Sequence, residues 1–361
     1  VRLFTMSVLL FVLTSWLCGF AGSLEALVFF RVLQGLVAGP MIPLSQTLLL
    51  ASYPKALAEA SADPELKAAD SFKQAAADLD VLFRVFGMVR EDGKRFHEGI
   101  DIRPAKTNAD GEALDLVLAA MDGQVAYLNA NVNGPYGRYV VLHHAAAEIP
   151  VYTLYAHLAK IEPSLKTAQP VRRGTVIGLM GRTSAGASPI TKDRSHLHFE
   201  VGLMLSRGFN RWYAAQPENK QSPNLHGLYN GQNLIGMDPM LILGQPKVDI
   251  LAALRSQPTA LTVGLRTNKM PDFVQNYPAL MRGDASHVAG WYVEFSWQGM
   301  PVRWTALDAK SPQLPAGRWR LLEIDQTQRT RLIQRKMLGA DGRTPGELLT
   351  QNLEVLLSTA R

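Results

Sequence analysis

The sequence is nearly without cysteine, since Cys18 is the only one in 361 residues. This excludes a scaffold held together by disulfides. Charged residues are also few, at 19%, while hydrophobic residues make up 47%. That balance excludes a disordered chain, because disordered chains are rich in charge and poor in apolar side chains. No internal repeat or low-complexity tract is present, and the length suggests two or three folded units.

Two long stretches contain no charged residue at all. They are residues 3–24 and 32–54, and only Glu25 and Arg31 interrupt the apolar sequence between them. Each stretch is long enough to cross a hydrocarbon core of about 30 Å as a helix that rises about 1.5 Å per residue. The first exceeds the usual signal-peptide core of about 7–15 residues, and no clear cleavage site follows it. We predict an α-helical membrane hairpin over residues 1–53, with a signal peptide or single anchor as the alternative.

Residues 81–245 are predicted to form a mainly β domain. Short β-type runs alternate with glycine turns, which is typical of a sandwich or barrel-like fold. Residues 54–80 are rich in Ala, Asp, Lys and Glu and indicate a polar helical linker. Residues 204–245 are rich in Asn, Gly and Pro and are expected to be loop-like. The β-type runs are residues 123–128, 139–142, 151–155 and 175–178.

Residues 246–361 are predicted to form a small mixed α/β accessory domain that ends in a helix near residues 345–359. This part carries the basic excess, with 15 Lys and Arg against 10 Asp and Glu, whereas residues 54–245 hold 20 of each. Because no DNA- or RNA-binding motif accompanies these charges, we interpret them as a solvated surface. We therefore expect no nucleic-acid partner.

Histidines occur in three short strand-like segments. In the first segment, His97 and Asp101 are four residues apart, so in an extended chain they share one face while Glu98 points away. This spacing differs from the H-E-x-x-H motif of helical metalloproteases. Glu98 is therefore not expected to act as the base.

The other two segments add three more histidines. His196, His198 and Glu200 share one face of a segment whose other face is apolar, and His157 ends a separate β-type run. Two histidines and one aspartate are sufficient protein ligands for a catalytic zinc ion, which keeps its fourth position for water. Together the three segments indicate a zinc site with further histidines beside it. His143 and His144 are interpreted as structural residues or as neighbours of the site, and His226 and His287 have no supporting context.

These segments resemble the motifs of lysostaphin/LytM-type peptidoglycan metalloendopeptidases, in the same order. The resemblance covers about residues 83–203. It implies the duplicated-hybrid-motif β-fold, one Zn²⁺ ion per chain, and the peptide crosslinks of peptidoglycan as substrate. It also implies that the zinc ligands are His97, Asp101 and His198, and that His157 and His196 are catalytic histidines that do not bind zinc. The matching segments are FHEGIDI, DGQVAYL, YGRYVVLHH, YAHL, VRRGTVIG and HLHFEV.

The mechanism expected from this resemblance is hydrolysis by a metal-activated water. One of His157 and His196 accepts the proton of that water and the other donates to the developing oxyanion, with both assignments open. Two segments depart from the motifs, Lys106–Leu118 and Arg182–Arg194, and both are expected to form groove walls. The alternative is a non-catalytic wall-binding or hydrolase-regulating module of the same fold, although such modules usually lack one or more of the five residues.

Residues 2–53 resemble the third and fourth helices of EmrB/QacA-type drug:proton antiporters of the major facilitator superfamily. The segment from Arg31 to Gly35 matches the R-x-x-Q-G motif of that family. The resemblance implies membrane contact through residues 3–53 and a membrane-associated location in the cell envelope.

Topology decides on which side of the membrane the peptidase domain lies. A single crossing would place it in the periplasm or outside the cell, whereas two crossings with Arg2 inside would return it to the cytoplasm. Two helices are about one-sixth of a transporter. Transport by a transporter fragment is therefore only the third interpretation. The simplest origin is a fusion joined near Tyr53–Ala58.

Overall fold

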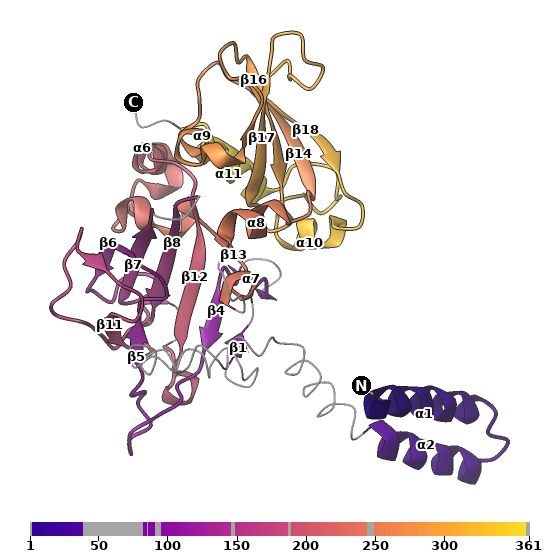
Figure 1. Cartoon of the computed structure of the whole chain (residues 1–361). Coiled ribbons are helices and arrows are strands. Elements are labelled where there is room, and N and C mark those ends of the chain that lie inside the picture. The colour runs from indigo at the N-terminus through magenta and orange to yellow at the C-terminus, as the bar shows by residue number, and fades with distance from the viewer. Residues whose placement is uncertain are drawn as a thin grey trace. The chain divides into compact units, whose positions relative to one another are not determined.

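The structure, a computed structural model, describes residues 2–38, 82–84, 86–90, 95–145, 149–186, 189–243 and 249–358. The chain divides into two compact units, Val1–Pro64 and Glu65–Arg361, and their helices and strands are labelled in Figure 1. The predicted polar linker at residues 54–80 and the end of the predicted hairpin at residues 39–53 lie outside the described residues.

The first unit contains two helices that pack against each other, α1 (Arg2–Gly19) and α2 (Leu24–Ala38). The Gln34 amide of α2 donates a hydrogen bond to the Ser15 hydroxyl of α1. Arg31 Nη1 in turn donates to Gln34 Oε1 at 3.0 Å, so the one cation inside this apolar sequence has a polar partner. No helix among the described residues is long and apolar enough to cross a membrane. The two helices are thus present, while their insertion into a membrane stays a prediction.

The second unit is mainly β, as predicted. Its largest sheet has the order β1-β4-β12-β8-β7-β6-β10, with β13 paired to β12 as an eighth strand, and all of these pairs are antiparallel. The apolar side chains of Leu142, Leu154 and Phe199 are fully buried and help to form its core. The strands are β1 (Leu82–Arg84), β4 (Ile100–Ile102), β6 (Gly123–Asn129), β7 (Tyr139–His144), β8 (Val151–Ala156), β10 (Pro170–Val171), β12 (Leu197–Met204) and β13 (Leu234–Met237).

The two segments that depart from the resembled motifs lie against each other. Glu112 of the first segment forms an ion pair with Arg182 of the second, with Nη2 and Oε1 3.0 Å apart. The first segment also ends in a strand of a small three-stranded sheet, so it is partly a component of the fold rather than only a groove wall. That sheet has the order β5-β11-β9 and comprises β5 (Leu116–Leu118), β11 (Val176–Leu179) and β9 (Lys160–Ile161).

Residues 204–245 are more regular than the sequence predicted. They contain a helix, α6 (Phe209–Ala215), and the strand β13. This strand pairs antiparallel with the second half of β12. Gly202 and Gly236 pair across this edge, and a Cβ atom at Gly202 would lie 2.1 Å from the Ile235 carbonyl oxygen. Gly236, one of the glycines that suggested a loop, is therefore part of a strand, and Gly202 opposite it permits the two strands to approach closely.

Residues 249–358 form a five-stranded sheet with short helices, which agrees with the predicted mixed α/β character. The sheet order is β15-β17-β16-β14-β18, and only the β15–β17 pair is parallel. Helix α11 (Glu347–Leu356) confirms the expected closing helix. The strands are β14 (Leu261–Arg266), β15 (Met281–Arg282), β16 (Gly290–Phe295), β17 (Pro301–Leu307) and β18 (Trp319–Ile324). The other helices here are α8 (Ile250–Arg255), α9 (Asp272–Asn276) and α10 (Arg329–Gln334), after α7 (Met240–Leu243).

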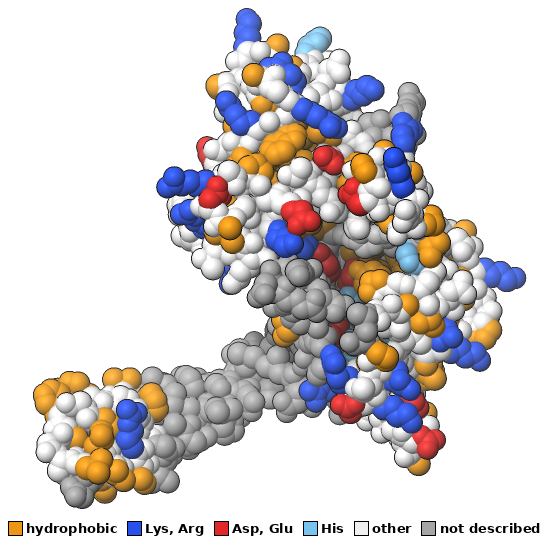
Figure 2. All heavy atoms as spheres, turned by 180° about the vertical axis from the view of Figure 1, so that it is seen from behind, with side chains coloured by type: hydrophobic (Ala, Val, Ile, Leu, Met, Phe, Trp, Pro, Cys, Tyr) orange, Lys and Arg blue, Asp and Glu red, His pale blue; other side chains and the backbone are white. Residues whose placement is uncertain are grey.

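The five-stranded sheet and the largest sheet share one continuous hydrophobic core. Polar contacts also join them: the Met204 amide donates to the Tyr277 hydroxyl at 2.8 Å, and the Ser206 hydroxyl donates to the Ser358 carbonyl at 2.8 Å. The predicted boundary between residues 245 and 246 falls in the undescribed residues 244–248. On the face drawn in Figure 2, Lys and Arg side chains are scattered with acidic ones among them.

Candidate metal centre

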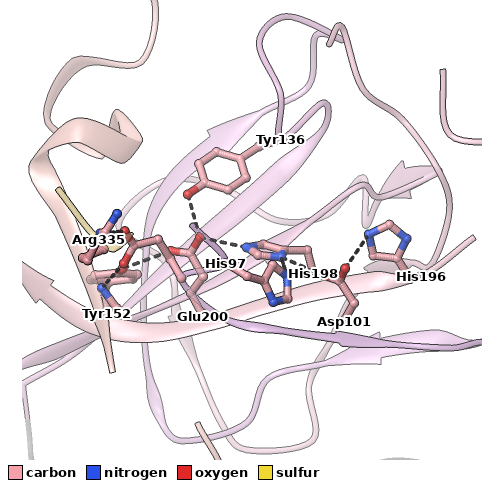
Figure 3. A network of polar contacts seen from close by, with 10 residues as sticks. His97, Asp101, Tyr136, Tyr152, His196, His198, Glu200 and Arg335 are labelled. Carbon is pink, nitrogen blue, oxygen red and sulfur yellow. Dashed lines mark hydrogen bonds and ion pairs between the residues drawn. The ribbon is translucent and has the colours of Figure 1, made fainter. Parts of the chain in front are cut away.

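Three adjacent strands bring the predicted site residues to one place. β12 lies between β4 and β8, and in this register His198 is opposite both Asp101 and Ala156. His97 precedes β4, His196 precedes β12, and His157 directly follows β8. Antiparallel pairing thus gathers side chains that are up to 101 residues apart in sequence. Figure 3 shows His97, Asp101, His196 and His198 close together.

The donor atoms of His97, Asp101 and His198 form a small triangle. His97 Nε2 lies 2.8 Å from Asp101 Oδ1 and 3.1 Å from His198 Nδ1, and His198 Nδ1 lies 2.9 Å from the same Asp101 oxygen. All three residues are buried, and they form a group able to hold a metal ion. Ligand atoms about 2.0–2.1 Å from a tetrahedral zinc are separated by about 3.3 Å. Two imidazole nitrogens and one carboxylate oxygen at this spacing therefore fit a zinc site with one position open.

A carboxylate behind His198 selects the tautomer that a metal ligand needs. His198 Nε2 lies 2.8 Å from Glu200 Oε1, and since a carboxylate only accepts, Nε2 carries the proton. Nδ1 then presents its lone pair to the triangle. The hydroxyls of Tyr136 and Tyr152 donate to the two Glu200 oxygens at 2.6 and 3.0 Å. Hydrogen bonds of this kind orient a metal-binding histidine and raise its basicity.

The charges of the cluster favour a cation at its centre. Burial raises the pKa of Asp101, but hydrogen bonds from His198 and His97 outweigh it and hold that pKa well below its usual range. Burial lowers the pKa of His198, but its hydrogen bonds to Asp101 and Glu200 raise it to about 10. Without a metal ion, these two buried carboxylates stabilise a second proton, on His198 Nδ1, and a metal cation would take the place of that proton.

His157 and His196 lie beside the triangle with their rings oriented by backbone carbonyls. His157 Nδ1 donates to the Thr183 oxygen at 2.8 Å, and His196 Nδ1 donates to the Arg194 oxygen at 2.7 Å. In both rings, Nε2 is then the nitrogen available for proton transfer. The ring centroids are 4.7 Å apart, and His196 Nε2 lies 3.5 Å from Asp101 Oδ2.

The backbone at His157 is held in an uncommon conformation. Its φ of 61° is in the left-handed region, which a residue with a Cβ adopts at some cost. The His157 amide donates to the Tyr136 carbonyl at 3.0 Å, which fixes this turn at the end of β8. Burial, followed by the nearby His196 and His198, lowers the pKa of His157 to about 3. The ring is therefore neutral near pH 7 and has a lone pair on Nε2.

The remaining histidines lie elsewhere. His144 is buried and bridges the Asp122 carbonyl and the Thr153 hydroxyl, so it has a structural position, while His143 is exposed. His226 contacts the Tyr127 ring, and His287 is exposed. The Glu98 carboxylate accepts hydrogen bonds from Arg335 and from the Gly236 amide.

Sequence reasoning missed the partners of Glu200. The alternation in His196-Leu-His198-Phe-Glu200 placed that carboxylate on the face of the two histidines but suggested no role for it. No local signal marked Tyr136 or Tyr152.

Comparison with known families identifies this part of the chain. Residues 95–208 match Peptidase family M23. All five predicted site residues lie in the matched range, and the resemblance to lysostaphin/LytM-type peptidases is confirmed.

Among solved structures, one similar protein is a zinc containing peptidase from Vibrio cholerae, 29% identical, with 33% of this chain and 32% of that chain covered and a TM-score of 0.25. Another is the catalytic domain of the antimicrobial peptidase lysostaphin from Staphylococcus simulans, 19% identical, with 45% and 92% covered and a TM-score of 0.29.

A second comparison concerns the transporter-like segment. Over 54 residues the chain is 70% identical to Multidrug export protein EmrB of Haemophilus influenzae. Over 56 residues it is 62% identical to Fatty acid resistance protein FarB of Neisseria gonorrhoeae. These matches cover 15% and 16% of this chain, and the chain spans only 11% of the length of either relative. They confirm the resemblance to an EmrB-type transporter over one segment and not over a whole transporter.

Proposed function

We propose that this protein is a zinc-dependent endopeptidase that hydrolyses peptide crosslinks of bacterial peptidoglycan. The observation that carries the proposal is the triangle of His97 Nε2, Asp101 Oδ1 and His198 Nδ1, with two oriented histidines beside it. This arrangement supplies three metal ligands and two groups for proton transfer. Peptidoglycan is proposed as the substrate because of the M23 match and the order of the motifs.

The residues of the site divide into three roles in this proposal. His97, Asp101 and His198 hold the metal ion, and Glu200 keeps the Nε2 proton on His198. A bound zinc supplies a Lewis acid that polarises the scissile carbonyl and makes a water molecule more acidic. Of His157 and His196, one accepts the proton of the attacking water at Nε2. The other, with its ring protonated on both nitrogens, donates a hydrogen bond from Nε2 to the carbonyl oxygen as negative charge develops on it.

The location of the protein is the second part of the proposal. Residues 3–53 attach the chain to a membrane of the cell envelope, with the peptidase domain on the side where the wall lies. The similarity to a segment of export proteins supports this attachment. Membrane fractionation with carbonate extraction tests it, and recovery of the full chain in the soluble fraction would contradict it.

The catalytic proposal is tested with the full chain, purified in detergent and loaded with zinc. It is incubated with intact crosslinked peptidoglycan, and the released fragments are analysed by mass spectrometry beside a His157→Ala control. New peptide termini that are absent in the control would establish the endopeptidase and identify the bond. Zinc binding without cleavage of this or other crosslinked peptides would instead favour a wall-binding or hydrolase-regulating module.

A further inference from the structure

One buried arginine connects the five-stranded sheet region to the metal-ligand segment. Arg335 directly follows α10, and only 11% of its side chain is exposed. Its Nη2 donates to Glu98 Oε1, and its Nε donates to the Gln298 carbonyl at 3.0 Å. The guanidinium carbon also lies 3.8 Å from the centroid of the Phe96 ring. Arg335 therefore contacts both neighbours of His97 in the sequence.

The Glu98 carboxylate is largely shielded from water, so its negative charge is costly unless a positive charge lies beside it. Only 20% of its side chain is exposed, and Oε2 accepts a hydrogen bond from the Gly236 amide at 3.1 Å. The carboxylate of Glu200 is close enough to repel it. Arg335 thus supplies the positive charge that pairs with this half-buried carboxylate. Figure 3 draws Arg335 on the side of Glu200 away from His196.

The segment that carries His97 also packs on the same region of the chain. Its Phe96 ring contacts the Trp297 ring edge to face, with the centroids 5.5 Å apart. The His97 amide donates to the Met88 carbonyl at 3.0 Å, and the Gly87 amide donates to the His97 carbonyl at 2.9 Å. Gly87 in turn lies against Trp297, because a Cβ atom there would be 2.8 Å from that ring. Trp297 and Arg335 therefore both lie against the segment that carries this ligand.

We propose that Arg335 is a positioning residue for the metal site, and that residues 249–358 complete this site rather than acting as a separate appendage. By pairing with Glu98 and stacking on Phe96, Arg335 keeps His97 Nε2 within the donor triangle. Removing one partner of a buried ion pair leaves the other charge unpaired, and the chain must move to solvate it. A shift of Glu98 moves His97, which is the adjacent residue. The inference rests on the metal site of the proposed function.

The test measures the zinc affinity of the full-length protein, by competition with a chromophoric chelator. Arg335→Met keeps an unbranched apolar stem and removes the guanidinium group with its charge. We expect zinc binding about 10–100-fold weaker, as for other groups that orient a metal ligand. Lys336→Ala is the matched control, because it removes the neighbouring positive charge, which pairs with Glu347 at the surface, and should leave zinc affinity unchanged. Wild-type affinity in folded Arg335→Met protein overturns the inference.

A double variant tests whether Arg335 acts by neutralising the charge of Glu98 or by supporting the fold. Glu98→Gln combined with Arg335→Met leaves no carboxylate unpaired, so we expect a folded protein that regains most of the zinc affinity, even if the single variant does not fold. A double variant that fails to fold, or that binds zinc as poorly as Arg335→Met, overturns the inference, because Arg335 would then act on the fold and not through Glu98.

The zinc measurement needs no substrate, so the two proposals fail separately. Loss of zinc in Arg335→Met supports the inference even if the wild-type protein cleaves no peptidoglycan. Unchanged zinc affinity in that variant overturns it even if the wild-type protein is an active endopeptidase.

Discussion

The two large sheets of this protein bury different kinds of side chain. At one end of the eight-stranded sheet the buried side chains are polar and bonded to one another, namely His97, Asp101, His196, His198 and Glu200. The interior of the five-stranded sheet is apolar and includes Trp291, Val293, Phe295, Val302 and Trp304. Nε1 of Trp291 and Nε1 of Trp304 have no hydrogen-bond partner among the described residues. The five polar residues of the first sheet thus pair with one another, whereas two buried indole nitrogens of the second sheet have no partner among the described residues.

This difference separates function from stability. Buried polar groups cost free energy unless they are fully hydrogen-bonded, so a network of them usually marks a site rather than a core. A large apolar side chain stabilises wherever it is well packed. Substitutions in the first sheet should therefore change metal binding and turnover, and those in the second should change the free energy of unfolding. Arg335 is the exception, because it comes from the second region and contacts the first.

The largest effect is expected for His157→Ala. This change removes a proton-transfer group but no atom of the donor triangle, so turnover should fall by about 10²–10⁴-fold while zinc remains bound. The measurement is peptide release from peptidoglycan, with zinc content determined on the same sample. His143→Ala, an exposed histidine at the end of β7, is the control and should retain full activity. Loss of zinc from the His157→Ala protein would contradict the assigned role.

A substitution in the interior of the five-stranded sheet should lower the stability of the protein and leave zinc binding unchanged. Trp304→Ala removes a fully buried side chain that stacks on Phe273, with ring centroids 5.7 Å apart. We expect the free energy of unfolding to fall by about 3–5 kcal/mol, with zinc affinity unchanged where the protein is folded. Urea titration measures the first quantity and chelator competition the second. Trp319→Ala, at a half-buried position on β18, should cost much less. If Trp304→Ala weakened zinc binding without destabilising the protein, the two sheets would not be separable in this way.

The sequence predicts features that depend on nearby residues better than features that depend on residues far apart in the chain. The ligand motifs are local: the four-residue spacing of His97 and Asp101, and the alternation of His196 and His198, both follow from the period of an extended chain. The resemblance to a family then assigned their roles. The structure brings His97, Asp101 and His198 close enough to hold a metal ion, and their role as zinc ligands stays a prediction.

The features that were missed depend on contacts distant in the sequence. β13 is four residues long and contains a glycine, and it is a strand because the edge of β12 pairs with it. Tyr152 reaches Glu200 across 48 residues, and Arg335 reaches Glu98 across 237. No periodicity within one segment encodes such pairs, so only the three-dimensional structure identifies them.

Removal of the metal ion tests whether the polar cluster is held together by the ion. A zinc ion that binds only the folded state adds about 2.7 kcal/mol to the free energy of unfolding at a concentration one hundred times its dissociation constant. We therefore expect a lower melting temperature after treatment with a chelator and recovery when zinc is restored. The His198→Ala variant lacks a ligand, so its melting temperature should not respond to zinc. An equal response in wild type and variant would place the stabilising zinc elsewhere.

A smaller effect should come from Glu200→Gln, which keeps the shape of the side chain and removes its charge. The amide oxygen can still accept from His198 Nε2, but the imidazole loses the carboxylate that raises its basicity. We expect zinc binding about tenfold weaker, at the low end of the range for such partners of a ligand. Glu354→Gln makes the same change on α11, where Glu354 accepts from Trp212 Nε1 at 3.2 Å, and should leave zinc affinity unaltered. Equal zinc affinities in the two variants would mean that the charge of Glu200 contributes only to the stability of the fold. Glu200 would then act as the buried side chains of the five-stranded sheet do, on stability and not on metal binding.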